Sequence, residues 1–337
     1  MNHTPAARDG EAPAPPPPRP PYPSRGVQVV TTRQLRALGI APHAAAAGAP
    51  AGSRYPELLP GIRLLHPGPA TAEERLYAAL LYTASRAATP GPAMITGLAA
   101  LALHHFTATP PLTALEHVEV LVPRSRRLCS TGFLRVVRGP CLPIPEEIGG
   151  IPTAPVPRAL ADAVAEVPDT PTVLRLLTEA VRGAHCEAAD ILRELGRCGL
   201  TDRPQVADAM DAVLAQGRAM AEGRLYAMVR GHRLPEPLWN VALRLPGGTP
   251  LIEVDAYWPE QAVALDLDTT RERPAIAGPD ARAAHRRSEL ERLGICLLRV
   301  SPDRLRTAPA DQAAVVRTAL IAAAEREPTG YVVVRPR

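Results

Sequence analysis

The sequence predicts an α/β protein, α+β overall, in which helical and β-rich segments precede a compact α/β unit near the C-terminus. Residues 71–88 place leucines at helical spacing. Two segments in which apolar and polar residues alternate, 251–258 and 261–268, are separated by a Pro-Glu pair typical of a turn. No apolar run approaches the roughly 18 residues of a membrane-spanning helix, so we expect no membrane segment.

The composition limits the classes of protein to consider. The 337 residues are enough for two or three compact units, and with aromatics at 3% the cores must rely on Ala, Leu and Val. All 38 basic residues are arginine, and the formal charge of +4 is too small to indicate a polyanion partner by itself. The five cysteines show no CxxC pair, which predicts reduced thiols. The N-terminus lacks the apolar run of a signal peptide, so we expect a cytoplasmic protein. No small-molecule cofactor is evident from the sequence.

The N-terminal region begins with a segment that cannot build a core. Residues 1–25 contain nine prolines, and we expect a disordered or polyproline tail there. Thr32 predicts the cap of a short helix that ends at Gly39. The dipeptide Pro60-Gly61 then predicts the turn of a tight hairpin over residues 58–65.

The rest of the chain alternates between helical and extended patterns. We expect helices at 71–88, at 94–106, up to about Val167, within 171–217 with breaks near Gly183 and Gly199, and at 219–232, 280–293 and 310–325. We expect strands at 117–122, 132–138, 239–245, 251–258, 261–268 and 295–300.

The hairpin formed by 251–258 and 261–268 concentrates acidic residues. A two-residue turn at Pro259-Glu260 would pair Trp258 with Gln261. Because side chains alternate along a strand, this register directs four acids to one face and the aliphatic residues to the other. The four acids are Glu253, Asp255, Asp266 and Asp268.

Four carboxylates on neighbouring strands repel one another and need compensation. A divalent cation such as Mg²⁺, which prefers oxygen ligands, would provide it, and could activate water and stabilise charge on a phosphoryl group. The alternative is an exposed polar face balanced by nearby arginines. The spacing alone does not decide between them.

The segment from about Ala221 to Arg306 carries a recognisable combination of motifs. They are a helix with Glu222, the strand Glu-Val-Asp-Ala-Tyr-Trp-Pro-Glu, the strand Ala-Leu-Asp-Leu-Asp, and the run Arg-Arg-Ser-Glu-Leu-Glu-Arg-Leu-Gly-Ile-Cys-Leu-Leu-Arg-Val. In this order they resemble the PD-(D/E)xK nuclease superfamily, specifically the small domains similar to very-short-patch-repair endonucleases. The resemblance implies a restriction-endonuclease-like domain over residues 218–306.

The resemblance also implies roles for individual residues. Asp255 corresponds to the metal-binding aspartate, Asp266 to the next acid, and Asp268 stands where a lysine is usual. The implied catalytic set is Asp255, Asp266, Asp268 and Glu222, and the metal set, for Mg²⁺, is Asp255, Asp266, Asp268 and Glu253. Arg282 or Arg286 would hold a phosphate of a DNA substrate. The sequence departs from the family in having Asp266 where Glu is usual, and in lacking the Gly and His that often follow the second strand.

Residues 27–200 resemble, more loosely, antitoxins of abortive-infection toxin–antitoxin systems. The motifs are Thr-Thr-Arg-Gln-Leu-Arg-Ala-Leu-Gly-Ile, Leu-Pro-Gly-Ile-Arg-Leu-Leu, Val-Glu-Val-Leu-Val-Pro-Arg and Gly-Ile-Pro-Thr-Ala-Pro-Val-Pro-Arg-Ala-Leu-Ala-Asp. The resemblance implies a degraded winged-helix-like module at 26–70 and a mixed α/β antitoxin-like region at 71–217, with a C-terminal helix and tail at 307–337. The position of the recognition helix, Ala41 to Arg54, is mostly Ala and Gly.

A second candidate for nucleic-acid contact is an arginine-rich segment without acids between Val120 and Pro145. It could contact phosphates without sequence preference. The alternative is a solvated loop and strand edge on which arginine limits aggregation. Its arginines are Arg124, Arg126, Arg127, Arg135 and Arg138.

Three functional hypotheses follow. The first is a DNA-directed protein with a metal-dependent endonuclease-like domain, favoured by the four-acid face. The second is a non-catalytic DNA-binding regulator or antitoxin-like protein that uses the nuclease fold as a scaffold and binds a toxin or other protein; the missing His and Lys favour it. The third is a protein-interaction module that uses the proline tail.

Overall fold

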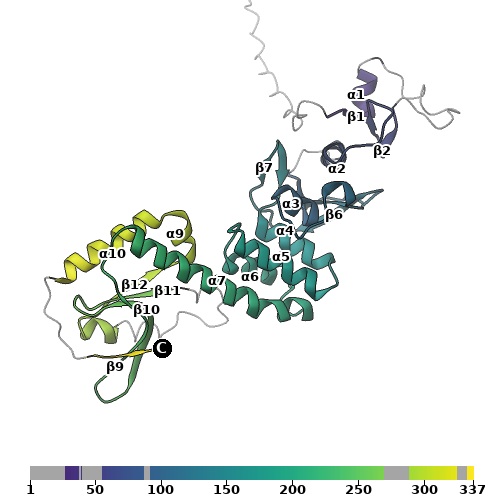
Figure 1. The fold of residues 1–337 in the computed structure, drawn as a ribbon. Coiled ribbons are helices and arrows are strands. Elements are labelled where there is room, and N and C mark those ends of the chain that lie inside the picture. The colour runs from purple at the N-terminus through teal and green to yellow at the C-terminus, as the bar shows by residue number, and fades with distance from the viewer. Residues whose placement is uncertain (1–26, 38, 40–54, 87–91, 269–287, 325–331) are drawn as a thin grey trace, which may run out of the picture. The chain divides into compact units, whose positions relative to one another are not determined.

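A computed structural model describes residues 27–37, 39, 55–86, 92–268, 288–324 and 332–337 (Figure 1). The chain forms two compact units, one of residues 1–95 and 112–154 and one of residues 96–111 and 155–337. The predicted tail at 1–25 and the predicted recognition segment Ala41 to Arg54 lie outside the described residues.

The first unit contains a small antiparallel sheet with the strand order β1-β3-β2. As predicted, β2 and β3 form a hairpin, and Gly61 occupies its turn with a φ of 84° that glycine accommodates without strain. The cap of the short helix is Thr31 rather than Thr32, because the Thr31 hydroxyl accepts the Gln34 N–H at 3.1 Å. The elements are β1 (Val29–Thr31), α1 (Thr32–Ala37), β2 (Glu57–Leu59) and β3 (Ile62–Leu64).

The second sheet of this unit has the order β6-β5-β4-β8-β7. Helix α2 packs against β5 and begins with a capping box between Thr71 and Glu74. The helix predicted at 94–106 begins instead with a buried strand, because Met94 and Ile95 join the sheet and Gly97, with a φ of 63°, turns the chain into the helix. The elements are α2 (Ala72–Ser85), β4 (Met94–Thr96), η2 (Leu112–Ala114), β5 (Val118–Pro123), β6 (Leu134–Gly139), β7 (Glu146–Ile148) and β8 (Ile151–Thr153).

The second unit begins with a group of helices. The predicted breaks near Gly183 and Gly199 are present. The boundary predicted between residues 217 and 218 falls inside one continuous helix, α7, so the segments on either side of it are not separate units. The helices are α3 (Gly97–Leu103), α4 (Val156–Glu166), α5 (Thr170–Arg182), α6 (Ala188–Arg197) and α7 (Pro204–Gly231).

Helix α7 packs on two different partners along its length. Its first half contacts α5 and α6, whereas Leu225 and Met228 in its second half are buried against the sheet of the same unit. Gly217 lies between the two halves, and a methyl group at this residue would come within 2.8 Å of the Ala188 Cβ on α6. Glycine therefore lets α6 approach α7 closely, just before the part of α7 that packs on the sheet.

The sheet of the second unit has the order β12-β11-β10-β9-β13, with β12 parallel to β11 and the other pairs antiparallel. Residues 288–292, the described part of the predicted 280–293 helix, are helical and precede β12. In the described residues between β12 and the edge strand β13 there are two helices. The elements are β9 (Leu238–Arg244), β10 (Pro250–Trp258), β11 (Val263–Leu267), β12 (Cys296–Val300), α9 (Pro302–Thr307), α10 (Pro309–Ala324) and β13 (Val333–Pro336).

The predicted register of the β10–β11 hairpin is wrong by two residues. Trp258 pairs with Val263 instead of Gln261, because the connection is longer than the expected two-residue turn. The Ala262 N–H donates to the Pro259 carbonyl, and Ala262 has a φ of 51°. Since the shift is an even number of residues, the paired residues 256–258 and 263–265 keep the faces that were predicted for them.

Apolar residues cover both faces of this sheet. Trp258 and Leu265 belong to a core that includes α7 and α10. Tyr257 and Ala264, on the other face, pack with Leu290 from the 288–292 helix in a second core. Ile252 and Val254, expected opposite the acids, pack in the same core as Tyr257, so the predicted alternation is interrupted between Val254 and Tyr257. Neither face of this sheet is therefore the fully solvated polar face that the hairpin alone allows.

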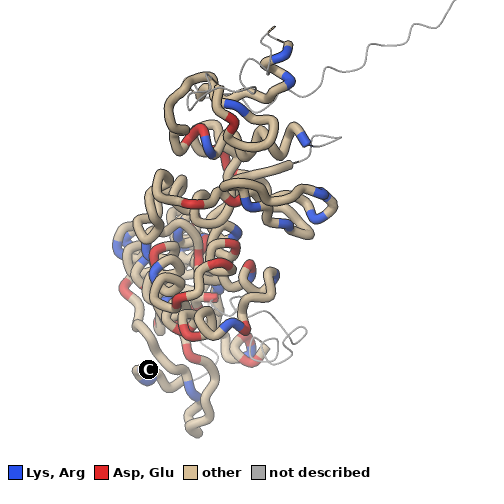
Figure 2. Tube along the Cα trace, turned by 90° about the vertical axis from the view of Figure 1, so that its right-hand side faces the viewer, with Lys and Arg blue, Asp and Glu red and all other residues tan. Residues whose placement is uncertain are grey.

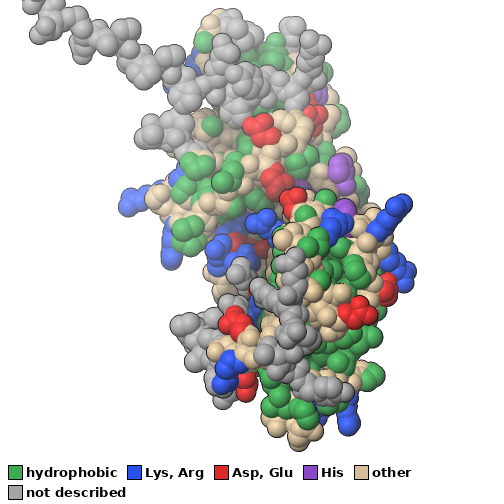
Figure 3. Space-filling view, turned by 90° about the vertical axis from the view of Figure 1, so that its left-hand side faces the viewer, with side chains coloured by type: hydrophobic (Ala, Val, Ile, Leu, Met, Phe, Trp, Pro, Cys, Tyr) green, Lys and Arg blue, Asp and Glu red, His purple; other side chains and the backbone are tan. Residues whose placement is uncertain are grey.

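The surface combines charged groups with exposed apolar side chains, as Figure 3 shows for one face. Large exposed apolar residues include Ile144, Val315 and Ile321. Among the helices that the structure describes, none is both long enough and apolar enough to cross a membrane.

The two glycines of α7 provide a test of its packing. Gly223→Ala places its methyl group in open space and should raise the free energy of unfolding by about 0.5–1 kcal/mol, because alanine favours the helix. Gly217→Ala should instead lower it by on the order of 1 kcal/mol, because the methyl group meets the Ala188 Cβ. Urea denaturation measures both, and equal stabilisation by the two substitutions would contradict the close α6–α7 contact.

Candidate functional site

The acidic residues lie where the ladder between β10 and β11 ends. The last backbone pair is Ala256 with Leu265, and the next residues along this register are Asp255 and Asp266. Here the Leu267 N–H donates to Asp255 Oδ2 at 2.6 Å. A side-chain carboxylate therefore binds a backbone group of the neighbouring strand, just beyond the point at which regular pairing stops.

Asp255 is buried, with only 3% of its surface exposed. A buried carboxylate needs a charged partner as well as hydrogen bonds. Arg218 on α7 supplies it, with its Nη2 at 2.6 Å from Asp255 Oδ1. The same guanidinium reaches Glu222, one helical turn further along α7, with Nε at 2.9 Å from Oε1. Arg218 thus bridges two of the sequence-predicted acids.

Asp266 is the acid whose ionisation the site changes most. Its pKa is raised to about 6, chiefly by burial and also by the nearby charges of Asp255 and Asp268, against the opposing effects of Arg299 and Arg218. Arg299, opposite Asp266 on β12, places its Nε 3.9 Å from Asp266 Oδ2. Asp268 is positioned by its backbone N–H, which donates to the Val300 carbonyl at 3.0 Å.

The structure therefore brings together four of the five predicted acids: Asp255, Asp266, Asp268 and, through Arg218, Glu222. The fifth, Glu253, is exposed and pairs at 3.0 Å with Arg337, which follows β13 beyond the other side of β9. Arg282 and Arg286 lie outside the described residues.

The family resemblance implies a Mg²⁺ ion at these acids, and carboxylate oxygens are suitable donors for it in chemical type. The arrangement does not fit an ion, however, because Arg218 takes one oxygen of Asp255 and the Leu267 N–H takes the other. Within the described ranges, no three His, Cys, Asp or Glu side chains are placed to hold a metal. An arginine stands where the cation was expected.

Sequence reasoning missed both arginines of this site. Arg218 lies one residue before the start of the helix predicted at 219–232. Its i,i+4 spacing to Glu222 is the sequence signal that points to it. Arg299 lies in a correctly predicted strand, but its position beside Asp266 depends on β12 being next to β11.

The arginine-rich segment of the first unit divides into two groups. Arg126 donates to the Thr83 carbonyl, and burial lowers the pKa of its guanidinium. Arg138 donates to the carbonyls of Arg126 and Leu128. Arg126 thus joins the β5–β6 connection to α2, and Arg138, although exposed, holds two carbonyls of that connection. The hydrogen-bonding capacity of both side chains is partly used within the protein.

The other members of the segment, Arg124, Arg127 and Arg135, are exposed. Figure 2 shows where basic and acidic positions lie along the trace. Arg135 is next to Glu119 in the parallel β5–β6 pair, so it lies beside a compensating charge. Arg124 and Arg127 are therefore the stronger candidates for contact with a polyanion.

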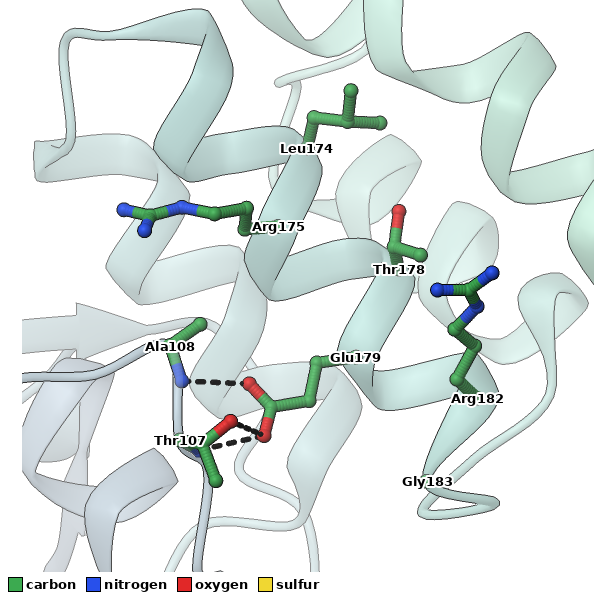
Figure 4. Close-up of a pocket in the computed structure, with 8 residues that line it drawn as sticks. All are labelled: Thr107, Ala108, Leu174, Arg175, Thr178, Glu179, Arg182 and Gly183. Atoms are coloured by element: carbon green, nitrogen blue, oxygen red, sulfur yellow. Dashed lines mark hydrogen bonds between the residues drawn. The ribbon is translucent and has the colours of Figure 1, made fainter.

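A separate hollow in the second unit has a volume of about 560 Å³ (Figure 4). Glu179 lines it and accepts hydrogen bonds from the Thr107 N–H at 2.6 Å, the Thr107 hydroxyl at 2.8 Å and the Ala108 N–H at 2.8 Å. Arg175 and Arg182 also line it, and each donates to a neighbouring side chain, Thr172 and Gln216 respectively. The residues that line this hollow include none of the sequence-predicted site residues.

Comparison with protein-family models, with curated proteins and with solved structures finds no match for this chain. The assignment of function therefore rests on the residues of the chain and on their arrangement.

The pKa of Asp266 predicts a specific dependence of stability on pH. With a folded-state pKa near 6 against an ordinary value of 3.8, the folded protein binds the extra proton, so this group destabilises the fold progressively as pH rises from about 4 to about 6. Asp266→Asn removes this loss of stability because asparagine does not ionise. Between pH 4 and pH 7.5, the free energy of unfolding of the variant should therefore rise by on the order of 2 kcal/mol relative to that of the parent.

Urea denaturation at the two pH values, without divalent ions, measures this change, and Asp211→Asn at an exposed position of α7 is the control. A difference between Asp266→Asn and the parent that stays constant from pH 4 to pH 7.5 would contradict the raised pKa.

Proposed function

We propose that this protein acts on DNA, and that its residues 218–306 form a nuclease-like domain of the PD-(D/E)xK type that hydrolyses phosphodiester bonds. The observation that carries the proposal is the meeting of Asp255 and Asp266 at the end of the β10–β11 ladder, with Asp268 close by. These are the three residues that the resemblance assigns to catalysis.

The order of elements supports the proposal. A helix bearing Glu222 is followed by three antiparallel strands, β9, β10 and β11, then by the helical residues 288–292 and by β12, which pairs in parallel with β11. This is the succession of helix, hairpin, helix and final strand on which the resemblance rests. Asp255 lies in β10, Asp266 in β11, and Asp268 directly follows β11.

The second candidate function is a non-catalytic DNA-binding regulator or antitoxin-like protein, with a toxin or another protein as partner. The specific observation in its favour is Arg218, which neutralises Asp255 without a metal ion. An acid set that is permanently paired with arginine would keep the fold and lose the chemistry. The small helix and hairpin formed by α1, β2 and β3 are compatible with either candidate.

Nicking of DNA decides between the two candidates. With Mg²⁺ or Mn²⁺, the parent protein should nick supercoiled, branched or mismatched DNA, and Asp255→Asn should reduce the rate roughly 100-fold or more because it removes an essential charge. Asp311→Asn, at an exposed position of α10, should retain the parental rate. If the parent nicks none of these substrates, the regulator is the better conclusion.

DNA affinity as a function of salt tests the exposed arginines. If Arg124 and Arg127 contact phosphates, changing both to Gln should reduce the slope of log affinity against log salt by about 1 to 2. Arg175→Gln combined with Arg182→Gln, two exposed arginines of α5, is the matched control with the same change in charge. An unchanged slope in the Arg124/Arg127 double variant would show that these residues do not contact phosphates and belong to a solvated loop.

A further inference from the structure

Arg218 occupies the oxygen of Asp255 that an incoming cation would need. The Leu267 N–H holds Oδ2 of Asp255, so Oδ1 is the oxygen left for a cation, and Arg218 Nη2 lies 2.6 Å from it. Because Asp255 is buried, its negative charge has to be balanced by some cation. In the structure that cation is a side chain of the same protein.

We propose that Arg218 is a built-in counter-cation that closes the acid site and competes with a divalent metal ion for Asp255. The proposal concerns the regulation of the proposed nuclease-like site and rests on that proposed function. It explains why the carboxylates are suitable ligands for a divalent ion although their present arrangement does not fit one. The closed form with Arg218 and the form with a bound metal ion exclude each other.

The charges of the site leave room for such an exchange. Among the described residues, the Arg218 guanidinium is shared between Asp255 and Glu222, and Arg299 lies 3.9 Å from Asp266. A divalent ion brings more positive charge to the cluster than Arg218 does, and it is stabilised by several oxygens at once.

The position of Arg218 allows it to leave without a change in the fold. Its side chain is 32% exposed, and that of Glu222 is 28% exposed. Both residues are on α7, and the i,i+4 pair can persist on the helix surface when Asp255 is released. Only rotations within the arginine side chain are needed, while the α7 backbone stays packed on the sheet.

Binding of Mn²⁺ to the full chain tests the proposal directly. We would titrate the parent and Arg218→Gln with Mn²⁺ and follow free Mn²⁺ by electron paramagnetic resonance. Removing the competing charge should lower the Kd for Mn²⁺ at least tenfold, because metal binding no longer requires a guanidinium to be displaced. Arg230→Gln, at an exposed position of the same helix, should match the parent. Adding Asp255→Asn to Arg218→Gln should abolish the gain.

Thermal stability gives a second readout that does not depend on activity. In EDTA, Arg218→Gln leaves Asp255 buried without its charged partner, so its Tm should fall below that of the parent. Mn²⁺ should then raise the Tm of Arg218→Gln by more than it raises that of the parent. If Arg218→Gln does not fold, Arg218→Lys carries the same test, because an ammonium group cannot bridge Asp255 and Glu222 as the guanidinium fork does. It should lower the Kd by about threefold.

Two outcomes separate this inference from the proposed function. If the parent binds Mn²⁺ through Asp255 and nicks DNA, but Arg218→Gln has a Kd within twofold of the parental value, Arg218 does not compete and the inference is overturned while the function stands. If neither protein binds Mn²⁺ and neither nicks DNA, the proposed function fails and the inference fails with it.

Discussion

The burial of Asp255 is the constraint on which the C-terminal part of the second unit depends. A carboxylate with 3% of its surface exposed must have its charge and its lone pairs satisfied. The Leu267 N–H and the Arg218 guanidinium do this from two directions, one from the neighbouring strand and one from α7. The hairpin opens at Asp255 because the side chain takes a backbone group, and the helix is tied to the sheet by the same residue.

Helix α7 connects the buried Asp255 to segments that are distant in the sequence. Its first half packs with α5 and α6, and its second half packs on the sheet, so a single rigid element determines where Arg218 lies. Gly217 permits the close approach of Ala188 immediately before Arg218. The sheet and the helices of the second unit therefore share one structural element, and the acid site lies on the part of it that meets the sheet.

All 38 Lys and Arg residues of this chain are arginine, and they perform two different tasks. Arg126, Arg138 and Arg218 use their planar, multiple donors to hold carbonyl or carboxylate oxygens of the protein. Arg124 and Arg127 are exposed. A run of arginines in sequence thus does not define one surface, because hydrogen bonds within the protein occupy some of their donors.

The sequence by itself determined most helices and strands of the second unit, including the hairpin of β10 and β11, but neither α9 nor the edge strand β13. Alternation along a strand is local, and the register error was even, so the paired residues 256–258 and 263–265 keep their predicted faces although the turn was predicted too short. The sequence did not determine that Val254 packs in the same core as Tyr257 and Leu290, or that Glu253 turns toward Arg337. Only the tertiary structure decided the charge balance of the site, because Arg218 is 37 residues from Asp255 and meets it through the packing of α7 on the sheet.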